Sequence, residues 1–258
     1  MRNAFVTPAG IAVPALTTAE MREVDRVAVE GFGLGVLQMM ENAGSILAAC
    51  VMEMAALRST LQSATIVAGG GGNGGGGLCA ARHLHNHGWG VRLILDRDAS
   101  VVRGPAERQL HILQAAGVIP IPSGDAKEAI WRADVVVDAL IGYSLRGAPR
   151  GRTAELIELC NGCSERVVSL DVPSGLDSTT GQSPGGVVRP ARTLTLALPK
   201  TGLASFCGEL WVADIGIPRE VYDRIGVRVT PFFGEARMTR LRLQKPGHLP
   251  KRQQEERQ

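Results

Sequence analysis

The sequence predicts an α/β fold in which helices cover both faces of a mostly parallel sheet, giving three layers. Three observations lead to this class. Short apolar runs alternate with helical segments from residue 63 onward, and these runs are continuous stretches of Val, Ile and Leu. A glycine-rich stretch, residues 69–77, joins the first run to a helical segment. Strands that are apolar at every position are buried on both faces, as in a parallel sheet between two helical layers.

The segment before residue 63 is predicted to be helical. Thr17 and Glu20 have the spacing of a capping box, and Met21 and Val24 follow at helical spacing. Glycines at positions 31, 33 and 35 interrupt this helix. A longer helix is expected at residues 36–57, and because it is apolar on most sides we expect it to be buried.

The segment after residue 62 is predicted to alternate between strands and helices. Strands are expected at residues 63–68, 90–95, 118–121, 134–138, 166–171, 192–197 and 210–213. Helices are expected at residues 75–87, 105–116, 127–131 and 153–160. The proline at position 105 suits the first turn of its helix, where the missing N–H is not needed.

The composition is that of an ordinary globular protein, with 45% hydrophobic and 21% charged residues among 258. No apolar run is long enough to span a membrane, and the N-terminus does not resemble a signal peptide. The five cysteines are an odd number without a disulfide-framework spacing. These features predict a cytoplasmic protein that does not act at a membrane.

The charge is unevenly distributed along the chain. From Arg237 to the end there are seven lysines and arginines against two glutamates, although the net charge of the whole chain is only +3. A near-neutral body argues against nucleic-acid binding. We therefore predict one domain over residues 1–236 and a basic, disordered tail over residues 237–258.

The residues that could bind a ligand or take part in catalysis lie at the ends of four predicted strands. The glycine-rich stretch follows the first of them, Asp138 and Asp171 are the last residues of two others, and Lys200 comes shortly after the fourth. Ligands of an open parallel sheet bind beyond the carboxyl ends of its strands, so these groups are expected on one rim. Either aspartate could instead cap a helix or stabilise a turn, and Lys200 could be a surface residue.

The glycine-rich stretch is predicted to bind a phosphate. Free backbone N–H groups and the helix dipole favour an anion where a strand leads into a helix. The stretch lacks the Lys-Ser/Thr of a Walker loop, and no acidic residue closes the next strand as the dinucleotide-binding fingerprint requires. A small molecule that carries phosphate groups is therefore the expected ligand.

At these residues the sequence resembles the NAD(P)HX epimerase family, also called the YjeF N-terminal domain. The resemblance covers about residues 16–218. It rests on five ordered motifs: Gln-Met-Met-Glu-Asn-Ala-Gly at 38–44, the glycine-rich stretch followed by Leu-Cys-Ala-Ala-Arg-His-Leu at 78–84, Val-Asp-Ala-Leu-Ile-Gly at 137–142, Asp-Val-Pro-Ser-Gly-Leu-Asp at 171–177, and Ala-Leu-Pro-Lys at 197–200.

The resemblance implies a Rossmann-like three-layer αβα sandwich, a homodimer, and interconversion of the R and S forms of hydrated NADH and NADPH. It also implies a bound K⁺ ion held by Asn73, Asp138 and Ser174. The substrate would be bound by Asp171 and by two segments of the rim. Their residues are Gly72, Asn73, Gly74, Gly75 and Gly76, and Gly142, Tyr143, Ser144, Leu145, Arg146, Gly147 and Ala148.

The resemblance further implies that Asp171 contacts the nicotinamide-derived ring and that Lys200 lies near it, and the chemistry of the hydrate leads to the hypothesis that both are catalytic. Asp171 would protonate the departing hydroxyl of the hydrate and later accept a proton from the water that adds to the opposite face. Lys200 would orient this carboxylate or adjust its pKa.

The glycine-rich stretch differs from the family pattern at two positions. Gly72 stands where the family has Asn, and Gly76 stands where it has an acidic residue. Two functional hypotheses therefore remain. The chain is either a stand-alone epimerase that works with a separate NAD(P)HX dehydratase, or a catalytically impaired relative that binds a nucleotide or a protein partner.

Overall fold

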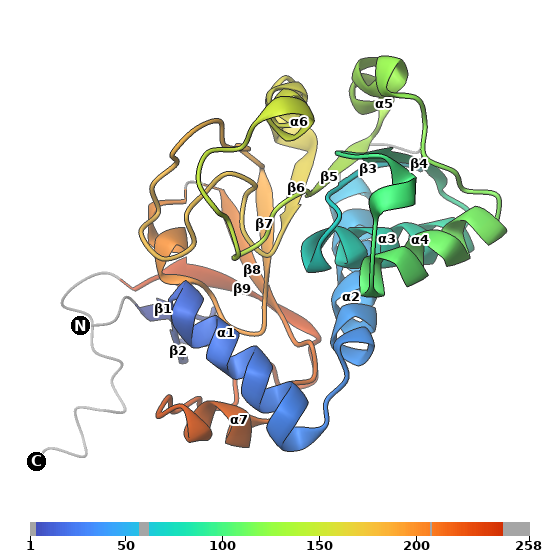
Figure 1. The fold of residues 1–258 in the computed structure, drawn as a ribbon. Coiled ribbons are helices and arrows are strands. Elements are labelled where there is room, and N and C mark those ends of the chain that lie inside the picture. Colours follow the sequence, from blue (N-terminus) through green and yellow to red (C-terminus); the bar gives the residue numbers. More distant parts are fainter. Residues whose placement is uncertain (1–3, 57–61, 207, 245–258) are drawn as a thin grey trace, which may run out of the picture.

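The computed structural model describes residues 4–56, 62–206 and 208–244. Within these residues one sheet of nine strands has the order β2-β1-β9-β8-β7-β6-β5-β3-β4 (Figure 1). The strands are β1 (Ala4–Val6), β2 (Ala12–Pro14), β3 (Ser63–Ala68), β4 (Gly90–Leu95), β5 (Val135–Ala139), β6 (Val167–Leu170), β7 (Arg192–Leu196), β8 (Glu209–Ala213) and β9 (Met238–Leu243).

Helices connect most of these strands. The α-helices are α1 (Thr18–Arg26), α2 (Val36–Ala56), α3 (Gly72–Asn86), α4 (Pro105–Ala115), α5 (Ala126–Arg132), α6 (Gly151–Asn161) and α7 (Arg219–Arg224). A π-helical turn, η1 (Val27–Gly31), extends α1. Short 3₁₀ turns are η2 (Ala99–Val101), η3 (Ser123–Asp125), η4 (Ser164–Arg166) and η5 (Thr201–Ser205). The predicted capping box is present, because Glu20 N–H donates to Thr17 and Thr17 N–H donates to Glu20.

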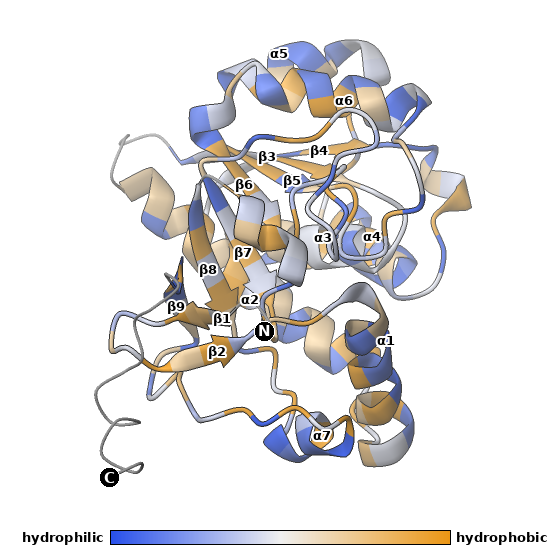
Figure 2. Cartoon of the chain, turned by 90° about the vertical axis from the view of Figure 1, so that its left-hand side faces the viewer, coloured by the Kyte–Doolittle hydropathy of each residue, from blue (hydrophilic) through white to orange (hydrophobic). Residues whose placement is uncertain are grey.

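The six strands from β3 to β8 are parallel, and both faces of this block are covered. Val135 and Val137 of β5 belong to a core that also contains residues of α2, α3 and α4, whereas Val136 belongs to a second core with residues of α5 and α6. Figure 2 shows the hydrophobic strands at the centre and hydrophilic residues along α1, α5 and α7. This confirms the predicted αβα class.

Residues 118–121 do not form the predicted strand. Pro120 makes only an isolated bridge with Leu93 of β4, and Ile121 N–H donates to the carbonyl of Leu93 at 2.9 Å. A proline has no N–H to donate to a ladder, so the pairing does not extend through this segment.

The predicted boundary of the tail at residue 236 is wrong. Met238–Leu243 forms β9, which pairs antiparallel with β8 and with β1. Leu241 of this strand is buried, and Arg240 pairs with Glu209 of β8 at 3.2 Å. In β9, Arg240 and Arg242 alternate with Leu241 and Leu243. The charge of this segment led to the prediction of a tail, although the alternation is that of a strand. The rest of the predicted tail, residues 245–258, lies outside the described residues, as does Leu57 at the end of the second predicted helix.

Two further predictions concern cysteines and membranes. The four cysteines within the described residues are buried free thiols, at positions 50, 79, 160 and 163. None of the helices in the described part of the chain has the length and apolar character needed to cross a membrane.

The glycine-rich stretch is mostly helix, although the sequence predicted a turn up to residue 75. Only three of its glycines precede α3, and Gly72–Gly77 form the first turns of the helix. A Cβ on Gly74 would lie 1.7 Å from the carbonyl oxygen of Gly69, and one on Gly77 would lie 2.5 Å from Cβ of Ala139. The absence of side chains therefore lets α3 begin directly against the ends of β3 and β5.

Alanine substitutions in this helix should have opposite effects at neighbouring positions. Gly72→Ala should raise the free energy of unfolding by about 0.4–1 kcal/mol, because alanine restricts the unfolded chain and its Cβ would meet no atom within 4 Å. Gly74→Ala should lower it by at least about 1–3 kcal/mol, as overpacked sites do. Denaturant unfolding measures both, and equal stabilities of the two variants would contradict this placement of α3.

Candidate active site

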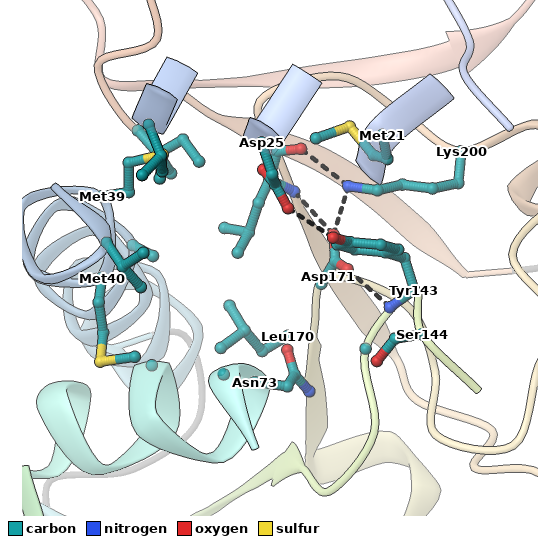
Figure 3. A pocket seen from close by; sticks show the side chains of 18 residues that line it. Met21, Asp25, Met39, Met40, Asn73, Tyr143, Ser144, Leu170, Asp171 and Lys200 are labelled. Carbon is teal, nitrogen blue, oxygen red and sulfur yellow. Dashed lines mark hydrogen bonds and ion pairs between the residues drawn. The ribbon is translucent and has the colours of Figure 1, made fainter. Parts of the chain in front are cut away.

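A cavity of about 290 Å³ lies at the carboxyl ends of β3, β5, β6 and β7 (Figure 3). The four strand ends that the sequence predicted to share a rim therefore do so. The lining residues are Met21, Asp25, Val29, Val36, Met39, Met40, Ala43, Gly72, Asn73, Gly76, Gly142, Tyr143, Ser144, Leu170, Asp171, Leu196, Lys200 and Ile215.

A buried ion pair between Asp171 and Lys200 forms the polar end of this cavity. The side chain of Lys200 is 1% exposed, and its Nζ donates to Oδ1 of Asp171. The same Nζ donates to the carbonyl of Leu196 at 2.8 Å and to Oγ1 of Thr195 at 3.3 Å. An ammonium group has three hydrogens, so each has an acceptor and Lys200 has a fixed position.

The backbone at Asp171 is left-handed, with φ of 68°. Such a conformation is uncommon outside glycine and costs about 1–3 kcal/mol in many sites, although Asp tolerates it better than most residues. The N–H of Asp171 donates to Leu194 at 2.8 Å, and Oδ1 accepts from the N–H of Leu196 at 3.3 Å. Contacts with β7 therefore hold the turn after β6, and this turn places the carboxylate at the cavity.

The segment after β5 also contacts Asp171. Tyr143 N–H donates to Oδ2 of Asp171 at 3.0 Å. A Cβ on Gly142 would lie 3.0 Å from this Oδ2 and 3.1 Å from Oδ1 of Asn73. Position 142 is therefore tight, and a side chain there would press on Asn73 at the start of α3 and on the Asp171 carboxylate.

The opposite side of the cavity is apolar. Met39 and Met40 of α2 lie across the cavity from the ion pair, whereas Met21 of α1 lies beside Lys200 (Figure 3). Val29 of η1 and Val36 of α2 also line the cavity. Methionine side chains adapt to flat apolar groups, and an apolar cavity with a few convergent polar groups is typical of small-molecule sites. The cavity therefore suits a ligand with a planar ring and a polar edge.

Asp138 lies beneath the rim and is completely buried. Its carboxylate accepts hydrogen bonds from Ser169 Oγ at 2.7 Å, Ser174 Oγ at 2.5 Å and Ser174 N–H at 2.9 Å. Burial raises the pKa of Asp138, and the hydrogen bonds from the two serines oppose this rise. Within the described residues no cation pairs with this carboxylate.

Asn73 is the second residue of α3, where the first backbone N–H groups have no acceptor within the helix. Its Nδ2 is buried and has no hydrogen-bond partner within the described part of the chain. A free amide and the positive end of the helix dipole thus face the same cavity, which favours an anionic group there.

The cavity includes some of the predicted site residues and excludes others. Gly74 and Gly75 are buried inside α3, and a Cβ on Gly75 would lie 2.5 Å from Cε of Met40. Asp138 and Ser174 lie below the cavity. In the predicted substrate-binding segment 142–148, the residues that do not line the cavity are Leu145, Arg146, Gly147 and Ala148.

The two positions that depart from the family pattern both lie at the cavity. Gly72 is exposed and open, so a side chain would fit there without displacing other atoms. A Cβ on Gly76 would lie 2.8 Å from Cδ2 of Leu170, which lines the cavity. Leu170 therefore closes the space beside Gly76.

Asp25 was missed by the sequence analysis. It lies near the end of α1 and lines the cavity, where its Oδ2 accepts a hydrogen bond from the Tyr143 hydroxyl at 2.5 Å. Burial raises the pKa of Asp25, and the hydrogen bond from Tyr143 opposes this rise. In the sequence it appears as one charged residue among several on an amphipathic helix, and nothing there indicates that it faces a cavity.

The parallel sheet and the cavity at its carboxyl ends define an α/β protein with a small-molecule site that contains an aspartate–lysine pair. Residues 36–202 match the family model described as YjeF-related protein N-terminus. The chain belongs to this family.

Several known proteins are similar to this chain over most of its length. The NAD(P)H-hydrate epimerase of Dehalogenimonas lykanthroporepellens is 50% identical over 230 residues, which is 87% of this chain and 91% of that protein. The NAD(P)H-hydrate epimerase of Rhodopirellula baltica is 35% identical over 222 residues, 83% and 89% of the two chains. The crystal structure of yeast ynu0 has a TM-score of 0.78, 24% identity, and coverage of 88% and 100%, which supports the fold.

A longer protein also matches. The bifunctional NAD(P)H-hydrate repair enzyme Nnr of Moorella thermoacetica is 36% identical over 217 residues. The match includes 80% of this chain but only 41% of that protein.

Proposed function

We propose that this protein interconverts the R and S epimers of hydrated NADH and NADPH, with Asp171 as the proton-transfer group and Lys200 as its partner. The epimerase activity rests on the 50% identity to an NAD(P)H-hydrate epimerase over most of both chains. The assignment of residues rests on one observation: a buried Asp171–Lys200 pair lies at the polar end of a cavity that is otherwise apolar.

The chemistry at the hydrated carbon requires a proton donor and acceptor. This carbon carries a hydroxyl next to the ring nitrogen, whose lone pair assists departure of the hydroxyl. Asp171 can receive a proton from Lys200 through their hydrogen bond and pass it to the departing oxygen. It then takes a proton from the water that adds to the other face and returns it to Lys200, so that no net proton is consumed. Lys200 keeps the carboxylate in place through a hydrogen bond to Oδ1, while Oδ2 remains on the Tyr143 side.

The phosphate groups are proposed to bind at the start of α3. Its first N–H groups lack acceptors in the helix, and Gly72, Asn73 and Gly76 line the cavity beside it. Backbone N–H groups carry this interaction, so it does not need the side chains that the family has at positions 72 and 76. This favours the active epimerase over the impaired binding module.

A coupled assay tests the proposed function. Hydrated NADH is prepared as a mixture of epimers and supplied with a dehydratase that consumes only the S form. With the protein present we expect complete consumption at a rate above that of spontaneous epimerisation. Consumption that stops at the S fraction, with the remainder disappearing only at the spontaneous rate, would leave the binding module as the function.

A K⁺ ion is proposed to bind near Asp138, with Asn73 and Ser174 as further ligands. The residues present fit such an ion, because the donor set consists of oxygen atoms and the buried Asp138 carboxylate lacks a cationic partner in the described structure. Hard oxygen donors suit an alkali cation. The ion would balance the buried charge and fix the ends of β5 and the loop after β6 relative to each other.

Potassium should therefore stabilise the protein. At a K⁺ concentration about 100 times its Kd, the free energy of unfolding should rise by about 2.7 kcal/mol, and Asp138→Asn should remove the increase. Melting temperatures in KCl and in tetramethylammonium chloride at equal ionic strength measure the effect. An increase that is the same in both salts, or that persists in the variant, would contradict a K⁺ site at Asp138.

We further propose that the protein is a cytoplasmic homodimer that works together with a separate dehydratase. A homodimer, a cytoplasmic location and cooperation with a separate dehydratase fit a repair function acting on reduced nicotinamide nucleotides. The longer bifunctional relative supports such cooperation, since the match leaves more than half of that protein for other activities.

A further inference from the structure

Tyr143 has three polar groups, and each contacts a different residue. Its N–H donates to Oδ2 of Asp171 after β6 at 3.0 Å, and its carbonyl accepts from Ser178 Oγ at 2.9 Å. Its hydroxyl donates to Oδ2 of Asp25 on α1 at 2.5 Å (Figure 3). The side chain therefore joins α1 to the segment that begins at residue 142.

The other end of α1 is attached to the loop that follows β6. Oγ1 of Thr18 lies 2.6 Å from Oγ of Ser178, the hydroxyl that contacts the Tyr143 carbonyl. In addition, Thr18 N–H donates to Oγ1 of Thr179 at 2.9 Å. Two polar connections, one at each end of α1, thus hold this helix over the cavity.

Asp25 contacts the rest of the cavity through the Tyr143 hydroxyl. It lies outside residues 36–202, the part that matches the family model. Within the described residues it forms no ion pair, and the Tyr143 hydroxyl is the hydrogen-bond partner that the structure gives it. Burial raises the pKa of Asp25, the hydrogen bond from Tyr143 lowers it, and the charges of Lys200 and Asp171 act on it in opposite directions. The Tyr143 hydroxyl is therefore the direct contact that fixes the Asp25 carboxylate.

We propose that Asp25 is a positioning residue that acts through the Tyr143 hydroxyl to hold the segment beginning at residue 142, of which Gly142, Tyr143 and Ser144 line the cavity, against Asp171. The proposal rests on the proposed epimerase function, for which this segment binds substrate. Asp25 accepts a hydrogen bond and does not move a proton to or from the substrate. Its contribution therefore lies in substrate affinity.

Four variants test this proposal, with KM and kcat from the coupled assay as the first readout. Asp25→Ala and Tyr143→Phe should each raise KM about tenfold and leave kcat within about threefold, as expected when one hydrogen bond to a charged group is lost. Asp25→Asn should stay within about threefold of the wild-type KM, because an amide oxygen still accepts the bond. The double variant Asp25→Ala/Tyr143→Phe should lose no more than either single variant.

Hydrogen exchange of the ligand-free protein gives a second readout that needs no activity. Amides of residues 142–148 should exchange faster in Asp25→Ala and Tyr143→Phe than in wild type. Glu23→Gln is the matched control, because Glu23 is on the same helix and pairs with Arg26 outside the cavity. It should change neither exchange nor KM.

Three results would overturn the proposal. One is unchanged exchange in both single variants. Another is a double variant whose loss in kcat/KM equals the product of the two single losses. The third is an Asp25→Asn variant with a large loss in kcat at unchanged KM, which would make Asp25 a proton-transfer group. If wild-type protein shows no epimerase activity, the proposed function fails, while the exchange measurements still decide whether Asp25 holds the segment.

Discussion

Asp171→Asn should lower kcat for epimerisation by about 10²- to 10⁴-fold, the range that positioned acid–base groups contribute. The amide keeps the size of the side chain, and its one oxygen can still accept from Leu196 and Lys200 at the Oδ1 position, although the bond from Tyr143 N–H to Oδ2 is lost. It cannot give up and regain a proton at the hydrated carbon. The rate is measured in the coupled assay after the spontaneous reaction is subtracted, so a residual enzymatic rate can be detected.

The matched control for this prediction is Asp177→Asn, at the end of the same motif. The Asp177 carboxylate accepts hydrogen bonds from the N–H groups of Thr179 and Thr180 and does not line the cavity. We expect its kcat to remain within about threefold of wild type, as is usual for positions away from a site. Wild-type activity in Asp171→Asn would exclude Asp171 as the proton-transfer group.

Lys200→Met should lower the free energy of unfolding by about 3–5 kcal/mol, because it leaves the buried Asp171 carboxylate without its cation. The lost interaction is strong because Lys200 is 1% exposed and its ammonium is surrounded by protein acceptors. Denaturant unfolding at neutral pH measures this change. Lys127→Met is the control, since Lys127 is exposed over the Trp131 ring and should cost about 0.5–1 kcal/mol.

The double variant Asp171→Asn/Lys200→Met separates the charge effect from the loss of packing. Removing both charges should restore most of the stability lost in Lys200→Met, because no uncompensated buried charge remains. Epimerisation should stay low in the double variant. If the double variant is less stable than Lys200→Met by the full cost of Asp171→Asn, then the two charges do not interact in the folded protein.

The Asp171–Lys200 pair also explains why the protein tolerates a left-handed residue at the end of β6. The turn at Asp171 is held by hydrogen bonds to β7, and Lys200 follows β7 in the next turn. The strain is therefore offset by contacts from a neighbouring strand. This arrangement keeps the carboxylate at the cavity before any substrate arrives, which reduces the reorganisation needed during the reaction.

The sequence determined the αβα class and the rim where the cavity lies. Continuous Val and Ile runs identify strands buried on both faces, and residues after parallel strands meet at one edge by geometry alone. Position along the chain was therefore enough to place Asn73, Tyr143, Asp171 and Lys200 near one another. The motifs at these positions also pointed to the family.

Local patterns failed where pairing or packing between distant segments determines the structure. β9 was read as part of a disordered tail, because its arginines dominate the composition and its partners, β1 and β8, are far away in sequence. The glycine-rich stretch was read as a turn, because glycine is a poor helix former. In the structure α3 begins at Gly72, and Gly74 and Gly77 pack so closely against Gly69 and Ala139 that a larger residue would collide with them.

One part of the cavity could be predicted from the sequence, and another part depends on the tertiary structure. The sequence by itself determined the polar end, since each of its residues follows a parallel strand whose end must lie on the rim. Only the tertiary structure decided that α1 covers this end and that Asp25 meets the Tyr143 hydroxyl. The physical reason is that an amphipathic helix specifies which of its faces is buried, but not the surface against which it packs. That surface is chosen by packing with strands far away in the sequence.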